Sequence, residues 1–296
     1  MPDSPLAREL SDLTNRRRIL EREAPPLPAM TRILTVSNQK GGVGKTTTTV
    51  NLAASLARLG ARVLVIDLDP QGNASTALGI EHHGDIPSIY DVLVAGAEIS
   101  DVMQRSGEQG ELFCAPSNLH LAGAEMEMYG AENREYILKG AINRLLAHPG
   151  ERFDYIFIDC PPSLGLLTVN AFAAAREVLI PIQCEYYALE GLSQLLNTIT
   201  MINAHLNPEL RVSTILLTMF DSRTRLAHEV ADDVRAHFPQ QVLKTVIPRA
   251  VRISEAPSFG QTVVSYDTAS VGSISYIEAA FELATRGAAA APGGNQ

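Results

Sequence analysis

Short runs of aliphatic and β-branched residues alternate along this chain with longer stretches in which apolar residues recur at helical spacing. The short runs predict strands at residues 33–37, 62–67, 155–159, 177–181 and 213–218. The longer stretches predict helices that include residues 46–59, which end at Gly60, and residues 189–206. This alternation predicts an α/β fold, a mainly parallel twisted sheet flanked by helices on both faces, with its sites at the carboxyl ends of the strands.

The alternating pattern stops near both ends of the chain. Residues 1–30 mix both charge signs and end in PPLPAM, while residues 286–296 read RGAAAAPGGNQ and have no periodic apolar face. We expect a flexible N-terminal extension over residues 1–30, a single domain over residues 31–285 and a disordered tail over residues 286–296. Two alternatives stay open for the extension, since it could form a short basic helix around residues 10–18 or reflect the choice of start codon.

Composition narrows the class of protein. With 296 residues, 46% of them hydrophobic and 19% charged, the chain is globular and neither disordered nor fibrous. Its apolar runs are far too short for a membrane span and it lacks a signal core, so we expect a cytoplasmic protein. The net charge of −9 means that any nucleic-acid binding needs a local cationic patch. The widely spaced cysteines 114, 160 and 184 predict reduced, structural thiols.

The segment QKGGVGKTT, residues 39–47, lies between the first predicted strand and the first predicted helix. In this context the backbone N–H groups of a glycine loop and the positive end of the helix dipole bind phosphate. Lys45 would reach the β- and γ-phosphates, and the Thr46 hydroxyl would bind Mg²⁺. The usual pattern has a glycine five positions before Gly44, where this chain has Gln39 followed by Lys40, so the loop is a deviant Walker A motif.

Two predicted strands end in carboxylates. The strand in VLVIDLDPQ ends with Asp67 and Asp69, whose side chains would point the same way in an extended chain and could face one metal and phosphate centre. The strand in YIFIDCPP ends with Asp159, as expected of a Walker B aspartate that supports Mg²⁺. The neighbouring pair His82 and His83 lacks carboxylate or cysteine company at metal spacing and predicts a solvated loop.

With these motifs, the chain resembles the ParA/Soj family of DNA-segregation ATPases. This family lies within the deviant Walker A group of P-loop NTPases, which also includes MinD. The resemblance runs from about residue 31 to about residue 283. Six blocks occur in family order: QKGGVGKTT, VIDLDPQGN, FIDCPPSLGLLTVNA, QCEYYALEGLSQLL, LLTMFDSRT and VIPRAVRISEAPSFG. The resemblance implies ATP and Mg²⁺ as cofactors.

The resemblance also implies roles for particular residues. Lys40 matches the signature lysine, which reaches across a nucleotide-sandwich dimer to the partner's ATP. Asp69 matches the acid needed for hydrolysis, and it would position or activate the attacking water together with Lys40 and Lys45 as catalytic residues. Asp67 and Asp159 would support the metal shell with Thr46. The residues implied to hold the phosphates are Lys40, Gly41, Gly42, Val43, Gly44, Lys45, Thr46 and Thr47.

Two further sites follow from the last third of the chain. Pro248 falls in the loop that frames the adenine, and Ala250 stands where family members commonly have asparagine, so only a backbone contact to the base could remain there. Arg223 and Arg252 match arginines that bind nonspecific DNA in the family. Cations gather in this region, but a solvated charged face with its arginines in salt bridges is the open alternative.

The resemblance implies a partition ATPase. ATP would join two subunits, the homodimer would bind nonspecific double-stranded DNA of the nucleoid, and a ParB-like centromere-binding protein would stimulate hydrolysis and release, with no membrane partner. One alternative is a MinD-like membrane-associated positioning ATPase, which needs an amphipathic terminal helix that RGAAAAPGGNQ does not offer. A second is a small-molecule P-loop enzyme such as a kinase or an ATP-dependent synthetase, for which the sequence shows no substrate motif.

Overall fold

The computed structural model describes residues 5–20, 24–148, 152–186 and 188–289. Its strands are β1 (Arg32–Val36), β2 (Arg62–Asp67), β3 (Gln104–Arg105), β4 (Glu111–Ala115), β5 (Tyr155–Asp159), β6 (Glu177–Gln183), β7 (Arg211–Phe220) and β8 (Val242–Pro248). They form one sheet in the order β3-β4-β2-β5-β1-β6-β7-β8, in which β3 pairs antiparallel with β4 and the other neighbours are parallel. This confirms the predicted α/β fold with a mainly parallel sheet.

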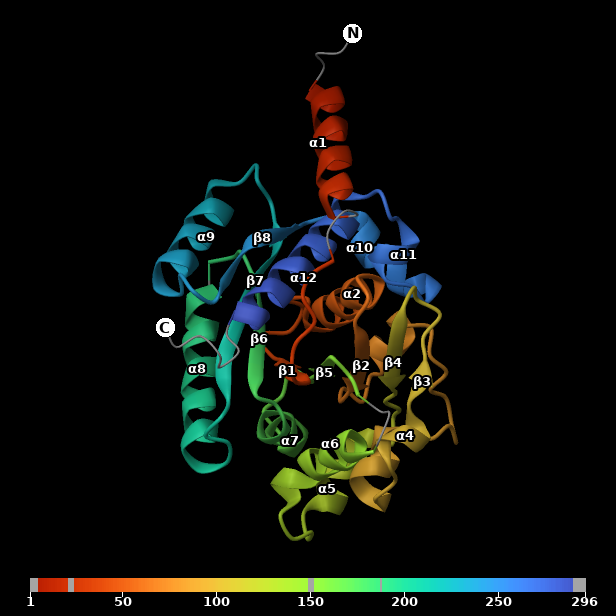
Figure 1. Cartoon of the computed structure of the whole chain (residues 1–296). Helices are drawn as coiled ribbons and strands as arrows, with labels where there is room; N and C mark the ends of the chain where they lie inside the picture. The colour runs from red at the N-terminus through yellow and green to blue at the C-terminus, as the bar shows by residue number, and fades with distance from the viewer. Residues whose placement is uncertain (1–4, 21–23, 149–151, 187, 290–296) are drawn as a thin grey trace.

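Helices cover both faces of this sheet (Figure 1). The longer ones are α1 (Pro5–Leu20), α2 (Lys45–Arg58), α5 (Leu121–Met128), α6 (Ile137–Ala147), α7 (Leu166–Ala174), α8 (Ala188–His205), α9 (Arg225–His237) and α12 (Val271–Ala289). The shorter ones are α3 (Asn73–Ala77), a π-helix η1 (Asp91–Ala95), α4 (Ile99–Val102), 3₁₀ helices η2 (Arg134–Tyr136) and η3 (Ala256–Phe259), α10 (Val251–Glu255) and α11 (Val263–Tyr266).

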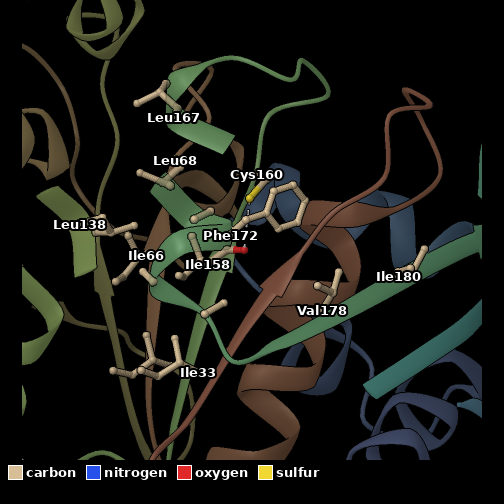
Figure 2. Close-up of a cluster of buried hydrophobic side chains, with 14 of the residues drawn as sticks. Ile33, Ile66, Leu68, Leu138, Ile158, Cys160, Leu167, Phe172, Val178 and Ile180 are labelled. Atoms are coloured by element: carbon tan, nitrogen blue, oxygen red, sulfur yellow. Dashed lines mark hydrogen bonds between the residues drawn. The ribbon is translucent and has the colours of Figure 1, made fainter. Parts of the chain in front are cut away.

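The strand residues divide between two cores because successive side chains of a strand point to opposite faces. Ile33 joins the core on the α6 and α7 side, shown in Figure 2, whereas the next residue, Leu34, joins the core under α2 and α12. β5 is buried along its whole length because it lies between β1 and β2 with helices on both faces. Strands buried in this way are continuously apolar, which is why the sequence predicted β2 and β5 with their observed bounds.

Three strands were not predicted from the sequence. β3 is only two residues long, β4 is a run of four apolar residues that begins after an exposed glutamate, and β8 contains a lysine in its middle. All three lie toward the edges of the sheet, where one side of a strand needs no apolar partner. The three cysteines at 114, 160 and 184 are free and buried, as predicted.

The sequence predicted a flexible N-terminal extension, with a short basic helix around residues 10–18 as an open alternative, and the structure has a helix there. Residues 5–20 form helix α1, and its Arg16 binds Glu278 of α12 through two hydrogen bonds of 2.8 and 2.6 Å. The partner lies 262 positions away along the chain, so no local pattern could indicate it. Residues 1–4 and 21–23 of the predicted extension lie outside the described residues.

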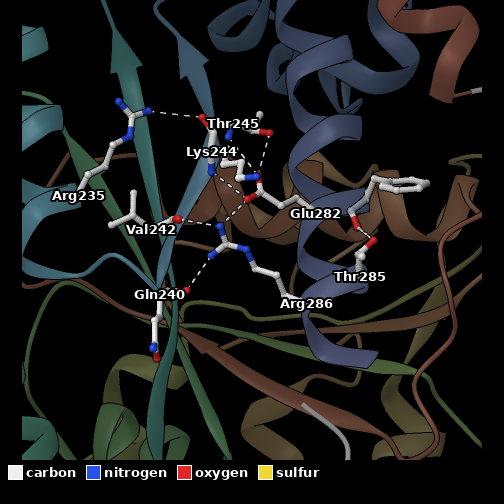
Figure 3. Close-up of polar contacts among 9 residues, drawn as sticks. Arg235, Gln240, Val242, Lys244, Thr245, Glu282, Thr285 and Arg286 are labelled. Atoms are coloured by element: carbon white, nitrogen blue, oxygen red, sulfur yellow. Dashed lines mark hydrogen bonds and ion pairs between the residues drawn. The ribbon is translucent and has the colours of Figure 1, made fainter. Parts of the chain in front are cut away.

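At the other end of the chain, α12 continues to Ala289, past the predicted boundary at residue 286. Figure 3 shows the reason: Arg286 donates to the carbonyls of Gln240 and Val242 at 2.9 Å each and to Glu282 at 2.6 Å. Glu282 in turn accepts the backbone N–H of Lys244, so the end of α12 is attached to β8. Residues 290–296 lie outside the described residues, and no described helix is both long and apolar enough to cross a membrane.

Candidate functional site

The phosphate-binding loop joins β1 to α2. Gly42 and Gly44 adopt left-handed backbone angles, with φ of 75° and 87°, which β-carbon-bearing residues rarely tolerate. No described atom lies within 4 Å of the position where a Cβ would stand on Gly41 or Gly42, so the loop has open space beside it. Among the described residues no side chain caps the N-terminus of α2. The N–H groups of its first turn are therefore left for a ligand, as an anion site requires.

Lys45 lies at the beginning of α2, underneath the loop. Its side chain is buried, and its amine lies 3.4 Å from the carbonyl of Lys40. Burial lowers the pKa of this amine below its usual value, and the attraction of Asp159 and Asp69 opposes that shift only in part. A buried cation whose charge is incompletely compensated has a strong electrostatic reason to bind an anion.

Lys40 lies on the outer limb of the loop and has a different environment. Its amine binds the carboxylate of Glu185, just after β6, at 2.9 Å, and the two side chains are 40% and 46% exposed. The backbone N–H of Lys40 donates to Asn38 Oδ1, which holds the limb itself in place. The structure therefore separates the two lysines of the motif into a buried one and an outer one. Sequence reasoning did not identify Glu185, which lies within the QCEYY block.

Asp159 and Asp67 form the floor of the site. They are register partners at the ends of β5 and β2, and both are fully buried. Asp159 accepts hydrogen bonds from Thr46 Oγ1 at 2.7 Å and Thr49 Oγ1 at 2.9 Å, while Asp67 accepts from both the backbone and the hydroxyl of Ser75. Burial, and for Asp159 the nearby Asp67, raises the pKa of Asp159 to about 7, and burial raises the pKa of Asp67 to about 6.

These residues fit a magnesium ion that also binds a phosphate. Among the described residues, no three His, Cys, Asp or Glu side chains gather into an all-protein metal cage. Mg²⁺ is commonly held by one or two carboxylates or hydroxyls together with substrate phosphates and water, which matches Thr46 and Asp159 beside the loop. A cation there would compensate carboxylates that burial otherwise keeps from ionising.

Asp69 lies in a turn and not in the strand. Because β2 ends at Asp67, the extended spacing that the sequence analysis assumed for the two carboxylates does not reach Asp69. Its backbone N–H donates to Asp67 Oδ1 at 3.2 Å, and its own carboxylate accepts from the N–H of Gln71 at 3.0 Å. Asp69 is thus partly exposed in a turn whose backbone is anchored to the floor of the site.

His82, which the sequence predicted to be a solvated loop residue, packs against the end of this turn. Its imidazole would touch a Cβ placed on Gly72, the residue that precedes α3. Its Nε2 lies 3.0 Å from the hydroxyl of Thr76 on α3. The next residue, His83, is exposed and stacks on His82 with ring centroids 5.0 Å apart. No sequence motif signals the His82 contact.

A small cavity of about 190 Å³ lies next to the phosphate-binding loop. Gly44 and Thr47 form one wall, and Met219, Pro248 and Ala250 contribute to the others. The predicted adenine-loop residues therefore do lie beside the phosphate loop, in a pocket with mostly apolar walls that suits a purine ring. Ala250 offers this pocket no side-chain hydrogen bond, and the sequence did not point to Met219.

Arg223 and Arg252 follow neighbouring strands. Phe220 pairs with Pro248 at the ends of β7 and β8, and the N–H of Arg249 donates to the carbonyl of Phe220 at 3.1 Å, so the two segments lie side by side. Both arginines are engaged within the chain: Arg223 makes bonds of 2.9 and 2.8 Å to Asp221, and Arg252 binds Glu255 at 3.0 Å. Both arginines therefore follow paired strand ends, and both have acidic neighbours.

A glycine loop opening a helix, with buried carboxylates at the ends of adjacent strands, defines a P-loop ATPase. A family model described as "AAA domain" matches residues 31–212. The chain is 50% identical over 258 residues to the sporulation initiation inhibitor protein Soj of Bacillus subtilis, covering 87% of this chain and 100% of that protein. It is 51% identical over 255 residues to the chromosome partitioning protein ParA of Myxococcus xanthus, covering 86% and 88% respectively.

The chain belongs to the ParA/Soj family of chromosome-partitioning ATPases. It is an ATPase that uses ATP and Mg²⁺. A solved structure named cobyrinic acid a,c-diamide synthase of Mycobacterium smegmatis, with a bound ATP analogue and magnesium, is also similar. It is 40% identical, with a TM-score of 0.72 over 85% of this chain and 93% of that chain.

Proposed function

We propose that this protein is a DNA-partition ATPase of the cytoplasm that associates with the nucleoid. ATP joins two subunits, the dimer binds nonspecific double-stranded DNA, and a ParB-like centromere-binding protein stimulates hydrolysis and release. The observation that carries the proposal is that the two loop lysines lie in different environments. Lys45 is buried beneath its own loop, whereas Lys40 lies on the outer limb and pairs with a partly exposed carboxylate. A lysine in that position is available to a second subunit's nucleotide.

The chain's own residues then have distinct roles. The loop from Gly41 to Thr47 and the amine of Lys45 bind the phosphates, and the cavity at Pro248 and Ala250 takes the adenine. Bound Mg²⁺, held by Thr46 with support from the buried carboxylates, supplies charge neutralisation for the phosphates. Asp69, partly exposed and anchored in its turn, orients the attacking water.

DNA binds at the carboxyl ends of β7 and β8. Arg223 and Arg252 are mostly exposed, and each already has a carboxylate partner, so a single subunit offers DNA few uncompensated cations. A dimer presents two such surfaces on one body, and simultaneous engagement multiplies weak phosphate contacts. This supports DNA affinity that depends on ATP. No base-reading motif accompanies these arginines in the sequence, which favours binding without sequence preference.

Size-exclusion chromatography and retardation of plasmid DNA test this proposal, each with ADP and with ATP. The wild-type chain and Asp69→Ala should dimerise and retard DNA with ATP, and Asp69→Ala should hold that state because it does not hydrolyse the nucleotide. Lys40→Ala should bind ATP and stay monomeric. If Asp69→Ala with ATP remains monomeric and leaves plasmid DNA unretarded, the proposal fails.

A second candidate function is favoured by one observation, the 40% identity to a chain named as a diamide synthase. A small-molecule enzyme would form ADP rapidly when supplied with its metabolite, without DNA or a protein partner. Assaying ADP release with a cobyrinic acid substrate and an amide donor, against plasmid DNA and a ParB-like protein, separates the two functions. Co-sedimentation with liposomes in the presence of ATP would instead support the membrane-associated alternative.

A further inference from the structure

His82 makes contacts that the proposed function does not yet use. It lies in the loop between α3 and η1, and its side chain is half-buried, whereas the neighbouring His83 is exposed. The side-chain amide of Gln104, on the edge strand β3, donates to the carbonyl of Glu81 at 2.8 Å. The backbone next to His82 is therefore attached to the edge of the sheet, which gives the ring a fixed base.

The ring of His82 occupies the space beside Gly72. A Cβ placed on Gly72 would lie 2.7 Å from Cε1 and 2.8 Å from Nδ1 of the ring, and 3.3 Å from the carbonyl oxygen of Ser117. Gly72 has a φ of 64°, in the left-handed region that glycine adopts most readily. Since glycine has the greatest backbone freedom of any residue, its position depends on what packs against it. Here the packing comes from the ring of His82 and the backbone of Ser117.

A second contact links the same ring to the other end of α3. Nε2 of His82 lies 3.0 Å from Oγ1 of Thr76, so the ring reaches from Gly72, just before the helix, to its last turn. Burial lowers the pKa of His82 and the charge of His83 lowers it further, while the contact with the Ser117 backbone opposes both. The ring is therefore uncharged at neutral pH, and its Nε2 can accept the proton of the Thr76 hydroxyl.

Gly72 is the last residue of the turn that holds Asp69. The N–H of Gly72 donates to the carbonyl of Asp69 at 2.9 Å, and the N–H of Asp69 donates to Asp67 Oδ1 at 3.2 Å. The turn is thus attached to the floor of the site at its first residue and to the His82 ring at its last. Because the turn is short, a displacement of Gly72 also moves the carboxylate of Asp69.

We propose that His82 is a positioning residue for ATP hydrolysis, whose ring fixes Gly72 and, through the turn, the carboxylate of Asp69. This inference deepens the proposed function and rests on it, because it takes Asp69 as the group that orients the attacking water. A group with that task must be held closely in place, since a misplacement of about 1 Å can slow a reaction about 100-fold. His82 acts through the turn and is not itself a catalytic residue.

Steady-state hydrolysis of ATP in the presence of plasmid DNA tests the proposal. His82→Ala opens space beside Gly72, so kcat should fall by roughly tenfold, while the KM for ATP should stay unchanged because the phosphate loop is intact. His82→Gln should recover part of this loss, because its amide can reach the Thr76 hydroxyl in place of Nε2. His83→Ala is the matched control, since it removes the exposed neighbouring histidine, and it should behave as the wild type.

A partner substitution tests the contact with α3. Thr76→Val removes the hydroxyl and keeps the shape of the side chain, so it should lower kcat by a smaller factor than His82→Ala. In the His82→Ala background it should have no further effect, because the contact is already absent.

Two readouts distinguish positioning from a contribution to stability. His82→Ala should still form the ATP-dependent dimer in size-exclusion chromatography, as Asp69→Ala should, because it binds the nucleotide and hydrolyses it slowly. The loss of kcat should also persist at temperatures far below the melting temperature of the variant, where the chain is fully folded.

The outcomes separate this inference from the proposed function. Hydrolysis by Asp69→Ala at the wild-type rate removes the role given to Asp69 and overturns the inference with it. If Asp69→Ala is inactive and His82→Ala keeps the wild-type kcat, the inference alone fails. A loss of kcat that His83→Ala reproduces, or that His82→Gln does not reduce, also overturns it. A wild-type chain that stays monomeric with ATP, but loses kcat in both His82→Ala and Asp69→Ala, overturns the proposed dimer and supports the inference.

Discussion

Releasing Lys40 from Glu185 should strengthen the ATP-dependent dimer. In the single chain the two side chains form an ion pair of 2.9 Å, and each is nearly half exposed. For Lys40 to reach a second subunit's nucleotide, this contact must break in both subunits. Exposed pairs contribute about 0.2–1 kcal/mol each. Two of them therefore oppose dimerisation by roughly 0.4–2 kcal/mol, which corresponds to about 2- to 30-fold in the dissociation constant.

Glu185→Gln keeps the size and a hydrogen-bonding oxygen but removes the charge, so it should tighten the dimer by that factor. Analytical ultracentrifugation with a slowly hydrolysed ATP analogue measures the dissociation constant, and binding of a fluorescent ATP at low protein concentration checks that the single subunit is unaffected. In a Lys40→Ala background, which should stay monomeric, the same substitution should not restore the dimer, because the pair is already absent. A weaker dimer in Glu185→Gln would refute the reasoning and indicate that Glu185 orients Lys40 toward the partner.

Three other substitutions or conditions test the site. Lys45→Ala should reduce ATP binding below detection in calorimetry, because the loop loses its buried cation; near-normal affinity would contradict this. Burial and Asp67 raise the pKa of Asp159 from 3.8 in the unfolded chain to about 7, so the folded chain binds this proton more tightly. Without nucleotide, the melting temperature should therefore fall as pH rises from about 4 to about 7, and Asp159→Asn should flatten that slope; a rise would refute the assignment. Arg223→Ala should weaken DNA retardation and reduce its salt dependence, whereas Arg144→Ala, at an ion-paired position on α6, should leave both unchanged.

The patterns that revealed the fold were local ones. A continuously apolar strand between two helical layers has the same signature wherever it occurs, so β2 and β5 were predicted with their observed bounds. The loop from Gly41 to Thr46 was equally visible, because glycine at positions of positive φ is a requirement of the backbone itself. Edge strands such as β8 lacked a comparable signature, since only one of their sides must be apolar.

The sequence pointed to the loop and the carboxylates of the candidate site. It did not indicate the contacts that orient those carboxylates. The sequence placed Asp69 in line with Asp67, but a strand that ends at Asp67 puts Asp69 into a turn. It also gave no sign that His82 packs on Gly72, because that contact depends on how α3 and the following loop fold back. Such details decide which oxygen faces the ligand, and spacing along the chain does not determine them.

The sequence by itself determined the class of this protein: the alternating elements, the deviant phosphate loop and the strand-ending carboxylates are each recognisable in a short run of neighbouring residues. Only the tertiary structure decided that Lys40 pairs with Glu185, 145 positions away, and that the N-terminal helix docks through Arg16 on Glu278. The physical reason is that backbone conformation responds to near neighbours, whereas ion pairs and exposed faces depend on which distant segments the packed core brings together.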